Sequence, residues 1–300
     1  MYDILILGGG PAGLSAALYA ARARRSVLVV EKDHLGRGII AASERVDNYP
    51  GCPGISGYEL ADTFRKQAKA FGATFRKAEI TSLERMDGGF LLHCKDGKPL
   101  AARCMIYAAG TSYRRLAIPG GTLLGVSYCA PCDGAFYAGK PVAVIGGGDT
   151  ALEDALYMAP IASEVYLIHR RDTFRANATL QANLRAAANV HPLLHAQAVR
   201  ILGETRVEGL VLTQDGKEQT LPVSGIFAAI GSLPNTSLLQ GVAALDANGY
   251  VLAGEDGITS VPGLFAAGDV RTKALRQVIT AAADGANAVQ SALRFLGGTT

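Results

Sequence analysis

The apolar residues of this chain gather in short unbroken runs, each followed by glycines or by a polar turn. Residues 4–7 and 27–30 form two such runs, and residues 142–145 and 165–168 repeat the arrangement later in the chain. Continuous apolar runs of this length are typical of strands buried on both faces, as in parallel sheets. Helical segments separate the members of each pair. The pattern predicts strand, helix and strand units in an α/β fold with two Rossmann-like domains.

The first run leads into a glycine-rich loop. Residues 8–13 read G-G-G-P-A-G, which gives G-x-G-x-x-G ahead of an alanine-rich helix over 14–24. Such glycines allow a sharp turn and bring a pyrophosphate close to the free N–H groups of the helix N-terminus. Glu31 ends the second strand, where a carboxylate can accept hydrogen bonds from a ribose diol. The combination predicts a dinucleotide site formed by Gly8, Gly10, Pro11, Ala12, Gly13 and Glu31.

The same motif returns in the second half of the chain. Residues 146–151 read G-G-G-D-T-A. The Ala-Leu-Tyr at 155–157 lies at the same distance from this loop as the Ala-Leu-Tyr at 17–19 does from the first loop, so the two copies align without a gap. Two copies imply two bound dinucleotides. The acid of the first copy is replaced by a basic turn, and guanidinium groups there suit the 2′-phosphate of NADPH. The predicted NADPH residues are Gly146, Gly148, Asp149, Thr150, His169, Arg170, Arg171 and Arg175.

The rest of the chain predicts how these units are connected. Shorter strands and a helix over 58–71 follow the first copy, and later strands are expected at 196–203, 206–213 and 225–230. Residues 263–269 predict another buried strand, and a closing helix is expected from 276 to about 295. Because the C-terminal segment again resembles the first unit, we predict that residues 1–112 and 241–300 form one discontinuous dinucleotide-binding domain. Residues 113–240 are then an inserted NADPH domain.

A C-x-x-C pair lies just ahead of the second glycine loop. Cys129 and Cys132 can cycle between dithiol and disulfide, and the adjoining Asp133 offers a carboxylate for proton transfer to a thiolate. A zinc half-site and a structural disulfide are the alternatives. The three other cysteines form no second C-x-x-C, so no metal site is predicted. The sequence favours catalytic residues Cys129, Cys132 and Asp133.

Composition narrows the possible partners. The net charge is +3, from 29 basic and 26 acidic residues. The basic residues form no stripe of the kind that binds nucleic acid. No apolar run approaches the roughly 20 residues of a membrane span. The N-terminus has no basic leader, so we expect a cytoplasmic protein, where a C-x-x-C is more often catalytic than structural.

Taken together, these motifs resemble the low-molecular-weight thioredoxin reductases over nearly the full length. The resemblance rests on residues 8–13 with Glu31, on 46–51 (V-D-N-Y-P-G), 129–134 (C-A-P-C-D-G), 169–176 (H-R-R-D-T-F-R-A), 230–236 and 263–269. It implies a homodimer that binds FAD in the discontinuous domain of residues 1–112 and 241–300. It further implies that the dithiol, in the NADPH domain of residues 113–240, passes electrons to thioredoxin. It also implies further FAD contacts at Gly38, Asn48, Gly110, Gly268, Asp269, Arg276, Gln277 and Val278.

Some positions depart from the family pattern. Ile39 stands where a flavin-contacting Gln is usual in the family, and Leu124 replaces a basic residue on a surface that the resemblance implies to face thioredoxin. Ser232 and Ala283 replace a usual His and Gly. Three other functions remain open from the sequence: a reductase for another protein disulfide, a dithiol oxidase that uses oxygen, and a non-catalytic flavin redox sensor. The oxidase would not need the basic turn at 169–171.

Overall fold

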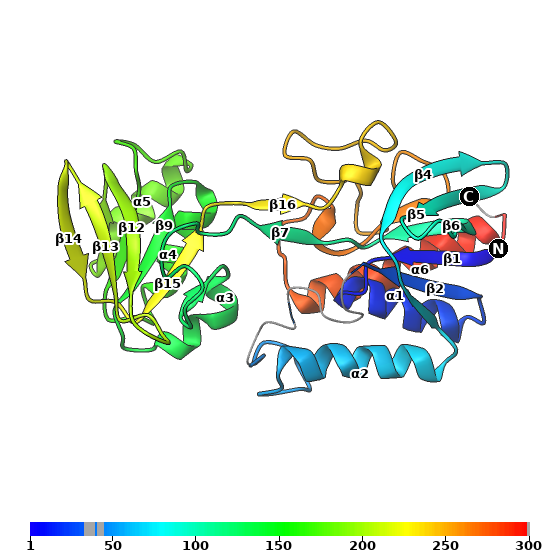
Figure 1. Ribbon diagram of the computed structural model, residues 1–300, viewed down its shortest axis with the longest axis horizontal. Coiled ribbons are helices and arrows are strands. Elements are labelled where there is room, and N and C mark those ends of the chain that lie inside the picture. Colours follow the sequence, from blue (N-terminus) through cyan, green and yellow to red (C-terminus); the bar gives the residue numbers. More distant parts are fainter. Residues whose placement is uncertain (33–39, 41–44, 299–300) are drawn as a thin grey trace. The chain divides into compact units, whose positions relative to one another are not determined.

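The structure is a computed structural model that describes residues 1–32, 40 and 45–298. The chain divides into two compact units, which are considered separately here. Unit 1 comprises Met1–Ser112 and Leu233–Thr300, and unit 2 comprises Tyr113–Ser232 (Figure 1). Among the described residues, no helix is both long and apolar enough to cross a membrane.

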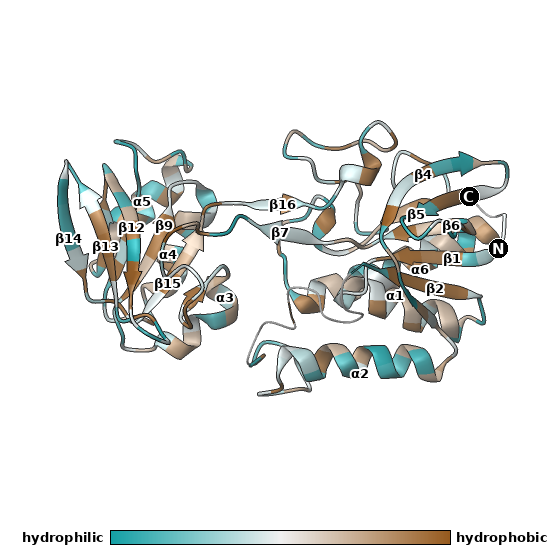
Figure 2. Cartoon of the chain, viewed as in Figure 1, coloured by the Kyte–Doolittle hydropathy of each residue, from teal (hydrophilic) through white to brown (hydrophobic). Residues whose placement is uncertain are grey.

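Unit 1 is built on a sheet in the order β3-β2-β1-β6-β5-β4, with β17 also pairing with β6. β1, β2, β3, β6 and β17 run parallel, whereas β4 and β5 form an antiparallel hairpin that joins β6. Figure 2 shows β1 and β2 as largely hydrophobic, as expected for strands covered on both faces. The bounds are β1 Tyr2–Leu7, β2 Val27–Glu31, β3 Thr74–Lys77, β4 Ile80–Met86, β5 Gly89–Cys94, β6 Leu100–Tyr107 and β17 Leu264–Ala266.

In the described part of unit 1, the α-helices are α1 Pro11–Arg22, α2 Gly57–Ala70 and α6 Val278–Leu296. α1 and α6 pack closely because small residues line both of them. A side chain at Gly285 of α6 would overlap the carbonyl oxygen of Ala12 in α1. This close approach brings the end of the chain to the first glycine loop.

Unit 2 contains a parallel sheet in the order β11-β10-β9-β15-β8 and a separate antiparallel sheet, β12-β13-β14. One core lies between the parallel sheet and the helices, around Val144, Leu152 and Phe227. A second core joins the two sheets around Ile145, Ile201 and Leu212. The bounds are β8 Val126–Ser127, α3 Ala130–Asp133, η2 Gly134–Tyr137, β9 Val142–Gly146, α4 Asp149–Met158, β10 Val165–Ile168, α5 Ala178–Ala186, β11 Val190–Leu193, β12 Ala196–Leu202, β13 Gly209–Gln214, β14 Lys217–Leu221 and β15 Gly225–Ala229.

The chain crosses between the units twice, and the two crossings pair as the short strands β7 Thr111–Tyr113 and β16 Ser232–Pro234. The return to unit 1 comes at Leu233, earlier than the predicted 241. The reason is that η3, Ser237–Leu239, packs its fully buried Leu239 into the core of unit 1. The Tyr107 hydroxyl also donates a hydrogen bond of 2.6 Å to the Asn235 carbonyl oxygen.

Two other element boundaries differ from the predicted ones. β17 ends at Ala266, and the chain turns at once into the short helix η4, Gly268–Val270, so Asp269 does not lie on a strand. The closing helix begins at Val278, because Gln277 has an extended backbone (φ −139°, ψ 161°) and acts as its N-cap.

Candidate active site

The first glycine loop leaves open space beside the N-terminus of α1. Gly10 is the N-cap, Pro11 is the first helical residue, and a side chain at Gly10 would meet no atom within 4 Å. Gly8 has φ +112°, and a side chain at Gly13 would overlap its carbonyl oxygen. Only glycine fits these two positions. The loop therefore forms a cradle for a phosphate group at the positive end of the helix.

The Glu31 carboxylate lies next to this loop. Its Oε2 atom accepts a hydrogen bond of 2.9 Å from the Gly9 N–H, and its Oε1 atom accepts one of 2.8 Å from the Lys32 N–H. The parallel pairing of β1 with β2 brings the loop and this acid to the same edge of the sheet. The predicted acid and glycines are thus neighbours, as ribose recognition next to a pyrophosphate requires.

A second acid reaches this region from the far end of the sequence. A side chain at Gly268 would lie 2.8 Å from the Cβ of Ala12, so η4 packs directly on the start of α1. Asp269 follows, and its Oδ1 atom is buried without a hydrogen-bond partner. Burial raises the pKa of this carboxyl, against the opposing effect of Lys273, Arg276 and Arg271. A buried acceptor without a donor is costly, and a hydroxyl of a bound flavin nucleotide would satisfy it.

The turn that carries Asp269 is held by a buried ion cluster. Asp284 of α6 accepts two hydrogen bonds from the Arg271 guanidinium, at 2.6 and 2.8 Å, and one of 2.9 Å from Lys273. It also accepts the Gly268 N–H at 2.9 Å. The three charged side chains are only 5–6% exposed. This cluster was not predicted, although the sequence carries a signal for it: Asp284 stands among small residues on the buried face of α6.

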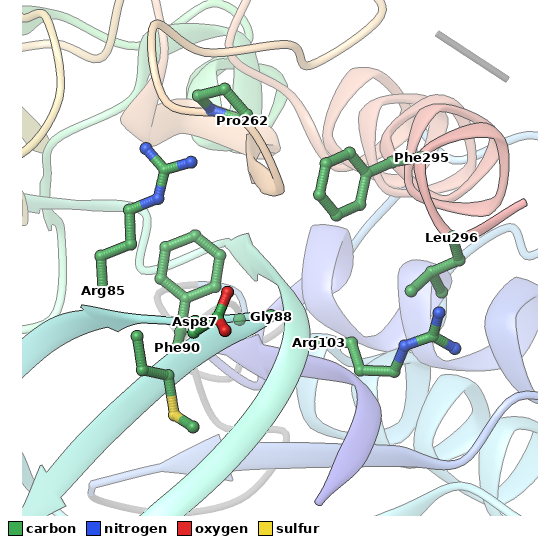
Figure 3. Close-up of a pocket in the computed structure, with 10 residues that line it drawn as sticks. Arg85, Asp87, Gly88, Phe90, Arg103, Pro262, Phe295 and Leu296 are labelled. Carbon is green, nitrogen blue, oxygen red and sulfur yellow. The ribbon is translucent and has the colours of Figure 1, made fainter. Parts of the chain in front are cut away.

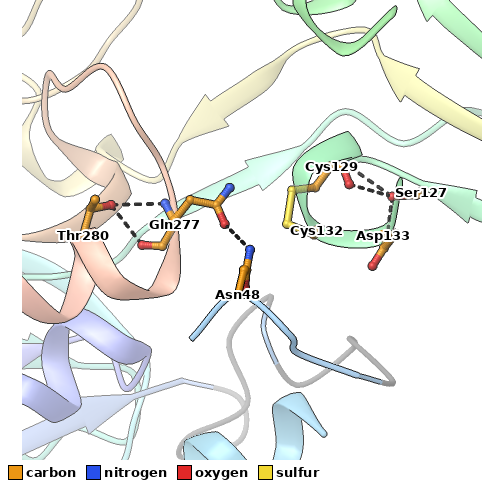
Figure 4. Close-up of a disulfide and its surroundings, with 7 residues drawn as sticks. All are labelled: Asn48, Ser127, Cys129, Cys132, Asp133, Gln277 and Thr280. Atoms are coloured by element: carbon orange, nitrogen blue, oxygen red, sulfur yellow. Dashed lines mark hydrogen bonds between the residues drawn. A yellow bond between two sulfur atoms is a disulfide. The ribbon is translucent and has the colours of Figure 1, made fainter. Parts of the chain in front are cut away.

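Of the other predicted FAD residues, Arg276, Gln277 and Val278 lie at the start of α6. Asn48 donates a hydrogen bond of 3.0 Å to the Gln277 side chain, and Gln277 and Thr280 form a capping box (Figure 4). The Arg276 guanidinium lies 4.2 Å from the centre of the Tyr250 ring. Gly110 has φ +63° with open space around it. Gly38 and Ile39 lie outside the described residues.

In unit 2, the second glycine loop rests on His169. A side chain at Gly147 would overlap the imidazole ring, which stacks on Phe174 at 5.3 Å and bonds the Thr173 carbonyl oxygen through Nε2. His169 is 6% exposed, and burial, with smaller effects of Arg175 and Arg171, lowers its pKa. The buried ring therefore packs against the glycine loop at Gly147.

The three arginines lie on the surface at the same edge of unit 2. Arg170, Arg171 and Arg175 are exposed. The backbone N–H of Arg175 donates a hydrogen bond of 2.8 Å to the carbonyl oxygen of Gly147 in the second glycine loop. At the start of α4, Gly148 is the N-cap with open space beside it. Asp149 accepts the Asn177 N–H at 2.8 Å and so joins α4 to the first turn of α5. Guanidinium groups beside an open helix N-terminus fit a nucleotide that carries an additional phosphate.

Cys129 and Cys132 form a disulfide at the start of α3 (Figure 4). Asp133 accepts a hydrogen bond of 2.6 Å from the Ser127 hydroxyl. The Ser127 Oγ atom in turn accepts a hydrogen bond of 3.1 Å from the Cys129 N–H. Ser127, which was not predicted, therefore holds both the acid and the cysteine backbone. No cluster of three or more metal-ligating side chains occurs within the described part of the chain.

The remaining cysteines differ from this pair in reactivity. Burial raises the pKa of Cys104 to about 12 and also raises the pKa of Cys94. We expect iodoacetamide at pH 8 to leave both thiols unmodified in the folded protein, because the thiolate is the reactive form. Prior reduction should add label at Cys129 and Cys132 only, and unfolding in urea should expose the rest. Peptide mass spectrometry reads each site. Label on Cys104 in the folded protein would contradict its burial.

A pocket of about 480 Å³ lies elsewhere in unit 1, between the β4–β5 hairpin and the end of α6 (Figure 3). Arg85, Asp87, Phe90, Arg103 and Phe295 are among the residues that line it. None of the predicted site residues does so, and the pocket is separate from the glycine loop of this unit.

Comparison with known proteins agrees with this geometry. Residues 2–285 match the family described as "Pyridine nucleotide-disulphide oxidoreductase". The chain belongs to this family. It is 43% identical, over 99% of its length and 66% of the relative's, to a bifunctional thioredoxin reductase/thioredoxin of Mycobacterium leprae. It is 40% identical to the thioredoxin reductase of Bacillus subtilis, over 99% of this chain and 95% of the relative.

Solved structures of family members have the same fold. The thioredoxin reductase of Streptococcus pyogenes is 36% identical, with a TM-score of 0.94 and 99% of both chains covered. The thioredoxin reductase of Giardia duodenalis is 34% identical, with a TM-score of 0.93 and the same coverage. The predicted α/β class and the resemblance to thioredoxin reductases are confirmed. As a member of this disulphide oxidoreductase family, the protein uses flavin and nicotinamide cofactors.

Proposed function

We propose that the protein is an NADPH-dependent thioredoxin-disulfide reductase, in which FAD and the Cys129–Cys132 pair relay the electrons. The observation that carries the proposal is the C-x-x-C disulfide beside an acid, in a chain with two dinucleotide folds. Relatives named thioredoxin reductase that align with almost the whole chain support it. FAD is assigned to unit 1 and NADPH to unit 2.

The residues of the chain have separate tasks in this reaction. In unit 1, the Gly8–Gly13 loop and Glu31 bind the adenosine diphosphate part of FAD, and Asp269 accepts a hydrogen bond from one of its hydroxyls. In unit 2, Arg170, Arg171 and Arg175 bind the 2′-phosphate of NADPH. Bound flavin supplies the transfer of two electrons from the nicotinamide to the disulfide.

The dithiol performs the last exchange with thioredoxin. One thiolate attacks the thioredoxin disulfide and forms a mixed disulfide, and the second thiolate then displaces the thioredoxin sulfur. The products are reduced thioredoxin and the Cys129–Cys132 disulfide. Asp133, held by Ser127, is placed to move the protons that the cysteine sulfurs gain and lose.

An anaerobic titration tests the proposal directly. NADPH should bleach the flavin absorbance of the purified protein, and oxidised thioredoxin should restore it. If NADPH bleaches the flavin but only a different protein disulfide restores the absorbance, the assignment of thioredoxin as partner is wrong, whereas the assignment of the cofactors is supported. Recovery by oxygen and a small dithiol alone would favour the oxidase instead. The homodimer and the cytoplasmic location remain predictions, and light scattering of the purified holoprotein tests the first.

The basic turn predicts a strong preference for NADPH over NADH. Each charge-assisted bond to the 2′-phosphate contributes about 1.5–3 kcal/mol, so Arg170→Ala and Arg175→Ala should each raise the KM for NADPH roughly 10- to 150-fold. The KM for NADH should change little. Arg185→Ala, which removes an exposed arginine from the last turn of α5, is the matched control and should affect neither. Equal KM values for both nucleotides in the unmodified protein would refute the assignment.

A further inference from the structure

The residue directly before the first cysteine of the pair, Tyr128, makes two contacts outside the dithiol turn. Its ring stacks on that of Tyr113, with the ring centres 5.4 Å apart and an angle of 16° between the planes. Its hydroxyl oxygen accepts a hydrogen bond of 3.0 Å from the backbone N–H of Leu116. Both tyrosines are half-buried. Residues 113–116 are therefore bound to the side chain that immediately precedes Cys129.

Tyr128 and Cys129 form the link between a strand and a helix. Before the link, β8 pairs with β15 through Val126 and Ser127. After it, the N–H groups of Cys132 and Asp133 donate hydrogen bonds to the Cys129 carbonyl oxygen and close the first turn of α3. The backbone of Cys129 itself is extended (φ −149°, ψ 99°). The stacked ring thus anchors the link between two segments that are each fixed by backbone hydrogen bonds.

The other ring of the stack belongs to the segment by which the chain enters unit 2. Tyr113 ends β7 and is the first residue of the unit. The next residue, Arg114, donates its backbone N–H to the Gly231 carbonyl oxygen at 3.0 Å, so this segment is fixed to the one by which the chain leaves the unit. The bonds that Ser127 makes, in contrast, stay within residues 127–133. The tyrosine stack therefore ties the dithiol turn to a separate part of unit 2.

We propose that Tyr128 and Tyr113 are positioning residues for the redox pair: their stacked rings hold the backbone ahead of Cys129 in the path that brings its sulfur to that of Cys132. The proposal rests on the role of the two cysteines as the redox dithiol. Formation of their disulfide depends on the effective concentration of one thiol at the other, which falls when the chain that carries one of them moves more freely. The stack then favours the disulfide over the dithiol.

The reduction potential of the pair distinguishes this role from simple stabilisation of unit 2. A contact that is equally strong in the disulfide and dithiol forms cannot shift the equilibrium between them, however much it stabilises the fold. Loss of such a contact would lower the unfolding midpoint and leave the reduction potential unchanged. Loss of a contact that positions Cys129 must change the reduction potential.

Tyr113→Leu removes the stack and leaves the Tyr128 hydroxyl in place, whereas Tyr128→Phe keeps both rings and removes the acceptor of the Leu116 N–H. His191→Leu is the matched control. It removes a ring that lies 5.5 Å from the Tyr166 ring, on β11 at the opposite edge of the sheet from β8. Tyr128→Leu, alone and combined with Tyr113→Leu, completes a double-mutant cycle.

Each flavin-loaded protein is equilibrated with reduced and oxidised dithiothreitol. Reduction breaks the bond between the two cysteine sulfurs and transfers two electrons and two protons from dithiothreitol to the pair, which leaves two thiols and oxidised dithiothreitol. The thiols at Cys129 and Cys132 are counted by alkylation and peptide mass spectrometry. The measurement uses neither NADPH nor thioredoxin, so a wrong coenzyme or partner in the proposed function would not alter its result.

In Tyr113→Leu, we expect the equilibrium to shift about three- to tenfold toward the dithiol, the range that a stacked aromatic pair can supply. That factor corresponds to about 15–30 mV. The shift should be the same at pH 6.5 and pH 8, because a contact between two rings involves no charged group. Tyr128→Phe should shift the equilibrium less.

The double variant should shift the equilibrium little further than Tyr128→Leu alone, because both substitutions remove one contact. His191→Leu should match the unmodified protein. The proposal is overturned if Tyr113→Leu stays within twofold of the unmodified protein, if His191→Leu shifts the equilibrium equally, or if the effects of the two leucine substitutions add in full.

Discussion

Cys132→Ser is expected to stop protein-disulfide reduction while flavin reduction by NADPH continues. A serine hydroxyl cannot form a disulfide with Cys129, so neither the relay of electrons nor release of the partner can occur. Turnover with thioredoxin should fall by roughly 10³-fold or more, as when a catalytic nucleophile is removed. The measurement is steady-state thioredoxin reduction together with the rate of flavin bleaching. Cys129→Ser should behave in the same way.

Cys52→Ser is the control for this experiment, since Cys52 is a free cysteine of unit 1. Its turnover should match that of the unmodified protein. Both serine variants of the pair should still pass electrons to a quinone dye, which needs no thiol. Asp133→Asn should also slow turnover, by about 10²- to 10⁴-fold, the range for a lost acid or base. Normal thioredoxin turnover in Cys132→Ser would show that the pair is not the conduit.

Asp284→Ala is expected to lower the free energy of unfolding by about 3–5 kcal/mol, the cost of leaving a buried charge without its partner. Arg271 and Lys273 are both almost fully buried and both bond this carboxylate. Its loss would leave two buried cations facing each other. Urea unfolding of the flavin-saturated protein measures the change, at one FAD concentration because bound ligand adds stability.

Glu79→Ala provides the comparison, because the Glu79–Lys95 pair is exposed and water screens it. Its unfolding midpoint should stay close to that of the unmodified protein. Asp284→Ala should also weaken FAD binding, since the Gly268 N–H loses its acceptor and the turn that carries Asp269 loses its anchor. An unchanged midpoint in Asp284→Ala would show that the cluster does not hold this turn.

Local sequence patterns predicted the strands, the glycine loops and the disulfide pair, because each depends on neighbouring residues. The apolar runs at β1, β2, β9 and β10 are buried as expected, since a strand covered on both faces needs no polar side. The boundaries were less accurate. Gln277 is a cap outside α6, and Asp269 lies on η4 beyond its strand, because capping geometry decides such ends.

His169 shows that a motif predicts the location of a site more reliably than the role of each residue within it. It was predicted as an NADPH residue, and the structure adds that its ring is buried against Gly147. The backbone path of the turn, and not the order of residues, decides which side chains face outward. The assignment of the three arginines to NADPH stays a prediction.

The sequence by itself determined the two dinucleotide folds, the insertion of one domain into the other and the identity of the redox pair. Those conclusions rest on spacing within a few residues and on the repetition of one motif. Only the tertiary structure placed Asp284 beside Arg271 and Gly268 against Ala12. These contacts join residues far apart in the chain. Their positions depend on how helices pack on sheets, which no local pattern of residues encodes.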